Sequence, residues 1–168
     1  VGKAGWYYNF GGIWQDVELI ASAPATVMDV FAKPYLSKRQ AVLEISLRNA
    51  GRARTLDLTC AVTPADGSGR AATRSQSVRV KRGETSLSVP IAMSRMRTWS
   101  PDDPFLYTAT VTLADGGQAL DTHTVRFGMR EFTIKNGRFL LNGNPIVLKG
   151  MLQQGMYPRT LIFPETKA

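Results

Sequence analysis

The sequence of 168 residues contains a single cysteine and a single histidine. Cys60 has no partner for an intramolecular disulfide bond, and a metal site built on several thiolates is excluded. Leu58 and Val62 flank it at alternate positions, which indicates a small, buried apolar side chain. His123 lies in DTHTV on a predicted strand and has no cysteine or histidine partner. We therefore expect no metal and no cofactor, and interpret His123 as a surface or cross-strand histidine.

Long apolar segments are also missing from the sequence. No run approaches the length that crosses a bilayer, and no basic and then apolar leader opens the chain. We expect a soluble chain without membrane contact; a periplasmic, secreted or cytoplasmic location stays open, because one free thiol does not determine the compartment. Neither a G-x-S-x-G motif nor a glycine-rich loop ahead of a helix occurs, which argues against that type of serine hydrolase and against a phosphate cradle.

Acidic residues are few, with 13 Asp and Glu against 21 Lys and Arg and a net charge of +8. Such an excess raises the possibility that nucleic acid or another polyanion is a partner. The basic residues are nevertheless scattered at strand ends and between apolar positions, without a basic helix or a zinc-finger or RNA-binding signature. We expect no nucleic-acid partner, and polyanion binding stays a minor alternative that salt-sensitive retention on heparin or DNA would reveal.

Alternation of apolar and polar residues dominates the chain, and no segment of ten or more residues has a convincing helical period. Residues 41–48 and 56–62 each predict a strand with one buried and one solvated face. Further strands are predicted at 25–33, 73–81, 85–92, 105–113 and 119–128. Turn motifs such as PADGSGR and KRGE separate them.

About seven short strands over roughly 110 residues, with a turn every ten or so residues, are typical of an immunoglobulin-like β-sandwich. We therefore predict an all-β fold with this sandwich over residues 22–128. The antibody type is excluded because its cysteine pair is missing. In PFLYTATVTL, the face that carries Tyr107 is expected in the core between the sheets, and the threonine-rich face in solvent.

The chain changes character after residue 128. Two Asn-Gly pairs, at 136–137 and 142–143, are flanked by short apolar runs, and each predicts a tight hairpin turn. Two such turns six residues apart predict a small meander rather than another sandwich strand. Beyond Gly150 the segment MLQQGMYPRTLIFPETKA has no amphipathic pattern and looks like the start of a further element; whether residues 151–168 are ordered stays open.

Three stretches carry a resemblance to a known family. In GGIWQDVEL the matching residues are Gly11, Gly12, Ile13, Trp14, Asp16 and Val17. In WSPDDPFLYTATVTL they are Trp99, Ser100, Pro101, Pro104, Leu106 and Tyr107. In FGMREFTIKNGRFLLNGNPIVLKGM they are Phe127, Gly128, Arg130, Phe139, Leu141, Asn142, Gly143, Pro145, Lys149 and Gly150. In this order and spacing, over nearly the whole chain, they resemble glycoside hydrolase family 2, which contains β-galactosidases, β-glucuronidases and β-mannosidases.

The resemblance implies a division of the chain into three parts. Residues 1–21 would be the end of a jelly-roll domain and a linker strand, residues 22–128 the sandwich, and residues 129–168 a β-meander that leads into a truncated catalytic (β/α)8 barrel. The aromatic residues near the start would then pack on the preceding domain and are expected to be exposed, disordered or covered by a neighbour; they are Trp6, Tyr7, Tyr8, Phe10 and Trp14. Trp99 is expected to pack against the sandwich edge, with stacking on a sugar ring as the alternative.

Members of the family are, by this resemblance, retaining glycosidases with two glutamates on the barrel, about 5 to 5.5 Å apart. Glu18, Glu44 and Glu84 lie at predicted strand or turn positions, and Glu131 and Glu165 do not match the catalytic motifs. No catalytic residue is therefore predicted. The resemblance instead implies a non-catalytic sandwich domain, whose parent enzyme hydrolyses O-glycosidic bonds with retention.

The last segment holds the candidate substrate-binding residues of the full enzyme. Where β-galactosidases and β-glucuronidases usually have an Asn-Arg/Lys-His run after the first barrel strand, this chain has Met-Leu-Gln-Gln-Gly-Met-Tyr-Pro at 151–158. This departure argues against a standard galactosidase or glucuronidase specificity. Gln153, Gln154 and Tyr157 are the candidates, because barrel active sites gather at that end of the strand.

The expected partners are the jelly-roll and barrel domains of the same chain and, in the full enzyme, a carbohydrate substrate; a homo-oligomer stays possible in principle. The alternative belongs to another class of protein, a free-standing β-sandwich module for carbohydrate binding or adhesion without enzymatic activity. An open reading frame that continues into a barrel-like pattern of strands and helices would favour the enzyme, and a stop codon after Ala168 with no upstream jelly roll would favour the module.

Overall fold

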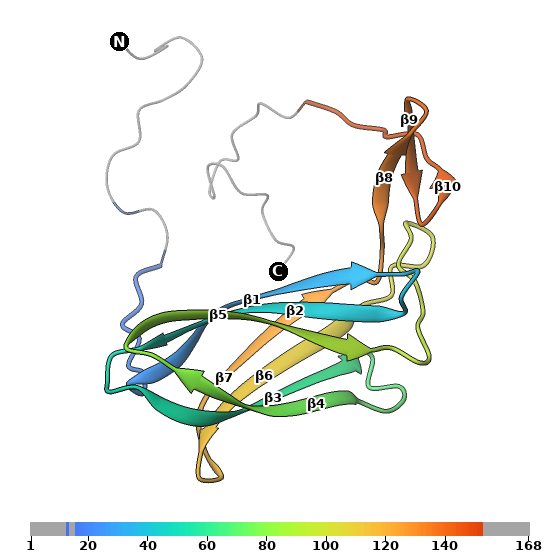
Figure 1. Cartoon of the computed structure of the whole chain (residues 1–168). Helices are drawn as coiled ribbons and strands as arrows, with labels where there is room; N and C mark the ends of the chain where they lie inside the picture. Colours follow the sequence, from blue (N-terminus) through green and yellow to red (C-terminus); the bar gives the residue numbers. More distant parts are fainter. Residues whose placement is uncertain (1–12, 14–15, 153–168) are drawn as a thin grey trace, which may run out of the picture.

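The computed structural model describes residue 13 and residues 16–152 of the chain. These residues form ten strands and no helix, arranged in three antiparallel sheets (Figure 1). The seven long strands are β1 (Ala25–Tyr35), β2 (Gln40–Asn49), β3 (Arg54–Pro64), β4 (Ala72–Val80), β5 (Gly83–Ala92), β6 (Tyr107–Asp115) and β7 (Gln118–Phe127). The all-β class is confirmed, and the seven sandwich strands lie close to the predicted ranges. The described residues contain no helix of the length and apolarity that would cross a membrane.

Two of the sheets face each other as a sandwich. One has the strand order β1-β2-β5 and the other β4-β3-β6-β7. The fourth strand therefore joins the second sheet, unlike the constant-type immunoglobulin arrangement, in which it joins the first. The connection at 81–82 crosses from one sheet to the other (Figure 1).

The core lies between the two sheets and is built from alternate positions on their facing sides. The largest fully buried aliphatic side chains in the strands are Leu43, Ile45, Leu47, Leu56, Leu58, Val62, Val80, Val89, Ile91, Val111 and Leu113. Burial of each stabilises the fold by about 1.5–3 kcal/mol relative to an exposed side chain. The period-two pattern that predicted the strands is the same pattern that places these residues on one face.

Strand β6 shows this alternation as predicted. Tyr107 and Val111 are buried in the core. The opposite face carries threonines whose hydroxyls lie near those of β7: the Oγ1 atoms of Thr110 and Thr124 are 3.5 Å apart, and those of Thr112 and Thr122 are 3.3 Å apart. Such cross-strand pairs stabilise a solvated sheet face.

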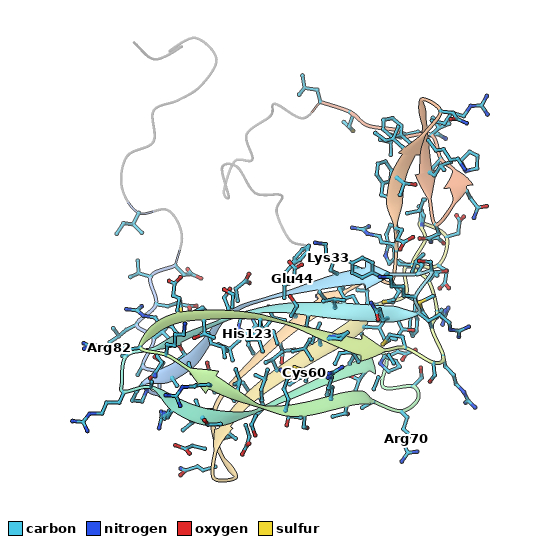
Figure 2. All side chains as sticks on the ribbon, in the orientation of Figure 1. Lys33, Glu44, Cys60, Arg70, Arg82 and His123 are labelled. Carbon is cyan, nitrogen blue, oxygen red and sulfur yellow. The ribbon has the colours of Figure 1, made fainter. Side chains whose placement is uncertain are left out.

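Cys60 and His123 both lie within the sandwich strands (Figure 2). Cys60 is fully buried in the core, as predicted, and this burial raises the pKa of its thiol to about 11. His123 lies opposite Val111 in the β6–β7 pairing and is half-buried, so it is a cross-strand histidine. Among the described residues no group of three or more His, Cys, Asp and Glu side chains could hold a metal ion.

β1 and β7 are edge strands of the two facing sheets, and a hydrogen bond that the sequence did not predict connects them. The pairing of β1 with β2 shifts register between Val27 and Asp29, which marks a β-bulge. The backbone N–H of Val27 donates to the carboxylate of Asp121 on β7 at 2.7 Å. This hydrogen bond joins the two sheets at that edge.

The third sheet is the predicted meander. It consists of β8 (Phe132–Lys135), β9 (Arg138–Leu141) and β10 (Asn144–Pro145), in the order β10-β9-β8, and stands away from the sandwich at the end where β7 finishes (Figure 1). Asn136 and Gly137 have φ angles of 50° and 70°, and Asn142 and Gly143 have 53° and 82°. Two consecutive positive φ angles define the type I′ hairpin turn, so both predicted turns are confirmed.

Candidate functional site

Two of the four described glutamates, Glu44 and Glu131, take structural positions. The carboxylate of Glu44 pairs with Lys33 Nζ at 3.1 Å on the surface. Glu131 Oε1 accepts a hydrogen bond of 2.8 Å from the backbone N–H of Leu36. Glu18 and Glu84 are exposed. Glu44 and Glu131 therefore serve the fold, and Glu131 does so at the place where the meander is attached to the sandwich.

The attachment is a cluster of side chains and backbone groups, which we name the hairpin junction. Its residues are Leu36, Trp99, Gly128, Met129, Arg130, Glu131 and Asn142. They come from three segments that are distant in the sequence: the end of β1, the connection between β5 and β6, and the passage from β7 through β9.

Trp99 occupies the centre of the hairpin junction. Its backbone N–H donates to the carbonyl of Met129 at 3.0 Å, and Met129 is fully buried. The guanidinium of Arg130 lies 4.5 Å from the centre of the Trp99 ring, a cation–π geometry. A Cβ atom at Gly128 would lie only 2.8 Å from the Cβ of Trp99, so the chain passes Trp99 at a distance that only glycine allows. Trp99 thus packs against the chain that leaves β7, the edge strand of its sheet, in agreement with the predicted packing at the sandwich edge.

Asn142 connects the meander to this centre through its side-chain amide. The amide nitrogen donates to the carbonyl of Trp99 at 2.9 Å, and the amide oxygen accepts from the N–H of Glu131 at 3.0 Å. The backbone N–H of Asn142 also donates to the carbonyl of Glu131 at 2.8 Å. The turn residue of the second hairpin is therefore bonded to both segments on which the meander rests.

Glu131 extends the same network to the first strand. Its carboxylate accepts the Leu36 N–H just after β1 ends, so a charged acceptor takes a backbone donor at the sandwich end. Hydrogen bonds of this kind are about twice as strong as neutral ones. The hairpin junction therefore holds the meander in one orientation relative to both sheets.

The meander presents apolar side chains to solvent. Phe132, Ile134 and Phe139 are 49%, 67% and 41% exposed. The rings of Phe132 and Phe139 stack with centroids 5.5 Å apart. The segment that follows β10 also exposes apolar side chains, those of Val147 and Leu148. A contiguous exposed apolar surface marks an interaction site more often than isolated residues do.

A second group of exposed apolar side chains lies before β1, at the opposite end of the sandwich (Figure 1). It consists of Ile13, Val17, Leu19 and Ile20. The two groups are the described parts of the segments that were predicted to meet neighbouring domains.

The structure does not test the substrate-binding residues named from the sequence. Gln153, Gln154 and Tyr157 lie outside the described residues, as do the aromatics Trp6, Tyr7, Tyr8, Phe10 and Trp14. The roles of Asn142 and Glu131 were missed, because a turn motif predicts backbone geometry and not the partners of the turn side chain. The available signal was that Trp99 and Asn142 are both among the residues that carry the family resemblance.

Comparison with known proteins agrees with this architecture. The family model described as glycosyl hydrolases family 2 matches residues 25–130, from the start of β1 to the junction residue Arg130. The chain belongs to glycosyl hydrolase family 2.

Several family 2 relatives align over most of the chain. A β-galactosidase of Streptococcus thermophilus is 31% identical over 157 residues, which cover 92% of this chain and 15% of that protein. A β-glucuronidase of Bacteroides fragilis is 28% identical over 158 residues, covering 86% of this chain and 22% of that protein. The chain thus spans less than a quarter of the length of either relative.

Solved structures confirm the fold. A family 2 member from Bacteroides cellulosilyticus superimposes with a TM-score of 0.66 at 19% identity, over 75% of this chain and 17% of that one. Bacteroides uniformis β-glucuronidase 2, in a calcium binding mutant with two Asp-to-Ala substitutions, gives a TM-score of 0.64 at 24% identity, over 77% of this chain and 17% of that one. The sandwich is therefore an architecture that larger family 2 proteins contain.

Proposed function

We propose that this family 2 chain provides a non-catalytic sandwich domain, and that the whole protein hydrolyses O-glycosidic bonds with retention through two glutamates located elsewhere. The proposal is supported by the relatives, which are named β-galactosidases and β-glucuronidases. It is also supported by Glu44 and Glu131, whose carboxylates are engaged by Lys33 and by the Leu36 N–H.

The observation that carries the proposal is the hairpin junction. Asn142 and Glu131 hold the meander against Trp99 and the end of β1, while the meander turns Phe132, Ile134 and Phe139 outward. A rigid attachment with an apolar outer face is suited to setting the orientation of a following catalytic domain. The role of the sandwich is then to position that domain.

The proposed boundaries follow from this role. Residues 1–21 belong to a preceding jelly-roll domain and linker, 22–128 to the sandwich, and 129–168 to the passage into a (β/α)8 barrel. The exposed apolar residues at both ends of the sandwich support this division. Gln153, Gln154 and Tyr157 stay the proposed substrate-binding residues of the whole enzyme.

The test compares the product of the full-length open reading frame with the 168-residue chain. Both are assayed on aryl β-galactosides, β-glucuronides and β-mannosides, and the anomer of the first product is followed by NMR. We expect the full-length protein to hydrolyse one of them with retention, and the 168-residue chain to show no turnover. Turnover by the 168-residue chain, or inversion by the full-length protein, would overturn the proposal. Glycan binding without hydrolysis by the full-length protein would favour the free-standing module.

A further inference from the structure

A groove of 630 Å³ opens at the sandwich end where β3 and β5 finish and β6 begins. Its lining includes apolar side chains: Val62 and Met93 are buried beneath it, and Pro64 and Phe105 are partly exposed. Its rim is polar and includes Ser68, Arg70, Ser94, Arg95 and Arg97. The volume lies within the range of about 300–1,000 Å³ that is usual for small-molecule sites.

The fold brings the three arginines of this rim together from two separate connections. Arg70 lies in the connection between β3 and β4, whereas Arg95 and Arg97 lie in the one between β5 and β6. In the sequence they are part of the scattered basic residues that gave no binding signature. Their convergence on one groove is a property of the tertiary structure.

Arg97 is held in place by its neighbours. Its guanidinium donates two hydrogen bonds, of 2.8 and 2.6 Å, to the carboxylate of Asp103 and lies 4.4 Å from the centre of the Phe105 ring. Its backbone N–H donates to the hydroxyl of Tyr107 at 2.8 Å. The wall of the groove on this side is therefore preorganised, which lowers the entropy cost of binding a ligand.

The other two arginines leave positive charge available. Within the part of the chain that the structure describes, neither Arg70 nor Arg95 forms an ion pair, and both are exposed. Of the nearby carboxylates, Asp103 pairs with Arg97, whereas Asp66 accepts a hydrogen bond of 2.9 Å from the N–H of Ser68 and keeps its charge. The groove thus combines apolar side chains, hydroxyl groups and two guanidinium groups that form no ion pair.

We propose that this groove binds an acidic saccharide, meaning a glycan that carries a carboxylate or sulfate group. Guanidinium groups bind planar or tetrahedral oxyanions through paired hydrogen bonds, which Arg70 and Arg95 are free to provide. Ser68 and Ser94 offer hydroxyls for the hydroxyls of the sugar, and the partly exposed side chains of Pro64 and Phe105 offer apolar surface for its C–H face.

Nucleic acid fits this groove less well. Binding of a nucleic-acid backbone uses a track of cations along successive phosphates, whereas these arginines surround one cavity. The choice of a saccharide among organic anions rests on the proposed function, because the relatives are named for hydrolysis of sugars.

The experiment measures binding to the 168-residue chain by isothermal titration calorimetry at low salt. The probes are trigalacturonate, a heparin-derived tetrasaccharide and the neutral trisaccharide maltotriose, with a 12-nucleotide single-stranded DNA as a general polyanion. We expect one or both acidic saccharides to bind and maltotriose not to bind. Binding of trigalacturonate would show that a carboxylate is sufficient, whereas binding of the heparin fragment alone would point to sulfate, because that fragment carries both groups.

Two double variants with equal loss of charge decide whether the groove is the site. Arg70→Ala with Arg95→Ala removes both available guanidinium groups, and we expect binding to weaken about tenfold or more. Arg79→Ala with Arg82→Ala removes two exposed arginines elsewhere; Arg82 lies at the opposite end of the sandwich from Arg70 (Figure 2), and binding should change less than about twofold. Circular dichroism and thermal unfolding confirm that both variants are folded.

Several outcomes would overturn the inference. They are the absence of binding by either acidic saccharide at millimolar concentration, equal binding of maltotriose, equal weakening by both double variants, and DNA binding as tight as that of the saccharides. The assay reads binding and not hydrolysis. A full-length protein without glycosidase activity would therefore overturn the proposed function while leaving a positive result here intact.

Discussion

The side-chain amide of Asn142 donates to the backbone carbonyl of Trp99 at 2.9 Å, although 43 positions separate the two residues in the sequence. The same amide accepts the N–H of Glu131 at 3.0 Å. One planar group thus joins the turn of the second hairpin to the β5–β6 connection and to the chain that leaves the sandwich. The orientation of the meander depends on this group, and its removal is the most direct test of the hairpin junction.

Asn142→Asp is expected to lower the free energy of unfolding by about 1–2 kcal/mol, because an aspartate retains the acceptor for Glu131 but loses the donor to the Trp99 carbonyl. Asn136→Asp is the matched control: Asn136 has the same positive φ in the first hairpin turn and is exposed. We expect the control to change stability by less than about 0.5 kcal/mol. Urea denaturation and exchange of the Glu131 amide hydrogen measure the effect, and equal losses in the two variants would contradict the role given to Asn142.

Gly128→Ala should destabilise the chain by about 1–3 kcal/mol, because the new methyl group would lie 2.8 Å from Trp99 Cβ and 2.9 Å from its Cγ. The control is Gly150→Ala, where a Cβ atom meets no atom within 4 Å. Thermal unfolding gives the stabilities, and tryptophan fluorescence, recorded with Trp6 and Trp14 replaced by Phe in every variant, reports a displacement of the Trp99 ring. Wild-type stability of Gly128→Ala would show that the junction can shift without cost.

Asp121→Ala is expected to cost about 1–3 kcal/mol, because the Val27 N–H at the β-bulge would lose its acceptor in a partly buried position. Asp115→Ala removes a carboxylate whose partner, Arg54, is 2.9 Å away at the surface. Such exposed pairs contribute at most about 1 kcal/mol. Urea denaturation of the two variants, with exchange of the Val27 amide hydrogen, tests the difference; an Asp115→Ala variant as unstable as Asp121→Ala would argue against the special role of the bulge contact.

The raised pKa of the buried Cys60 thiol predicts a loss of stability at alkaline pH. Burial raises the pKa of its thiol from 9.0 to about 11, so the folded state disfavours the thiolate. The stabilisation is complete below pH 9, where the thiol is protonated in both states, and it is lost as the pH rises from 9 towards 11, because the unfolded chain ionises first. The loss amounts to about 2 kcal/mol near pH 10.5.

The measurement for Cys60 is urea denaturation at several pH values in the wild type and in Cys60→Ala. Tyrosines and lysines also titrate in this range, so the informative quantity is the difference between the two proteins. That difference should shrink as the pH rises from 8 to 10.5. A difference that stays constant would show that the thiol does not contribute to the pH dependence.

Most of the fold could be predicted from local patterns. The alternation in 41–48 and 56–62 predicted strands that the structure shows with nearly the same bounds, because burial of one sheet face requires an apolar residue at every second position. The two Asn-Gly pairs predicted both hairpin turns, since asparagine and glycine tolerate the positive φ angles that these turns require. The burial of Cys60 followed from its apolar neighbours in the same way.

The candidate sites could not be predicted in this way. Trp99 lies 43 positions from Asn142 and Leu36 lies 95 positions from Glu131, and no local pattern records which distant backbone group a side chain will reach. The β-bulge at Val27 and its acceptor Asp121 were missed for the same reason. From the sequence, the arginines that line the groove were interpreted as scattered charge. Arg70 and Arg95 come to the same groove only when two connections meet at one sandwich end.

Strand period and turn chemistry are local, so the residues of each element were enough to predict an all-β sandwich followed by two tight hairpins. How the meander is attached, which edge Asp121 closes and where the basic residues gather became visible only in the folded chain. Those features depend on the relative placement of strands that are distant in the chain, and that placement follows from packing of the whole core.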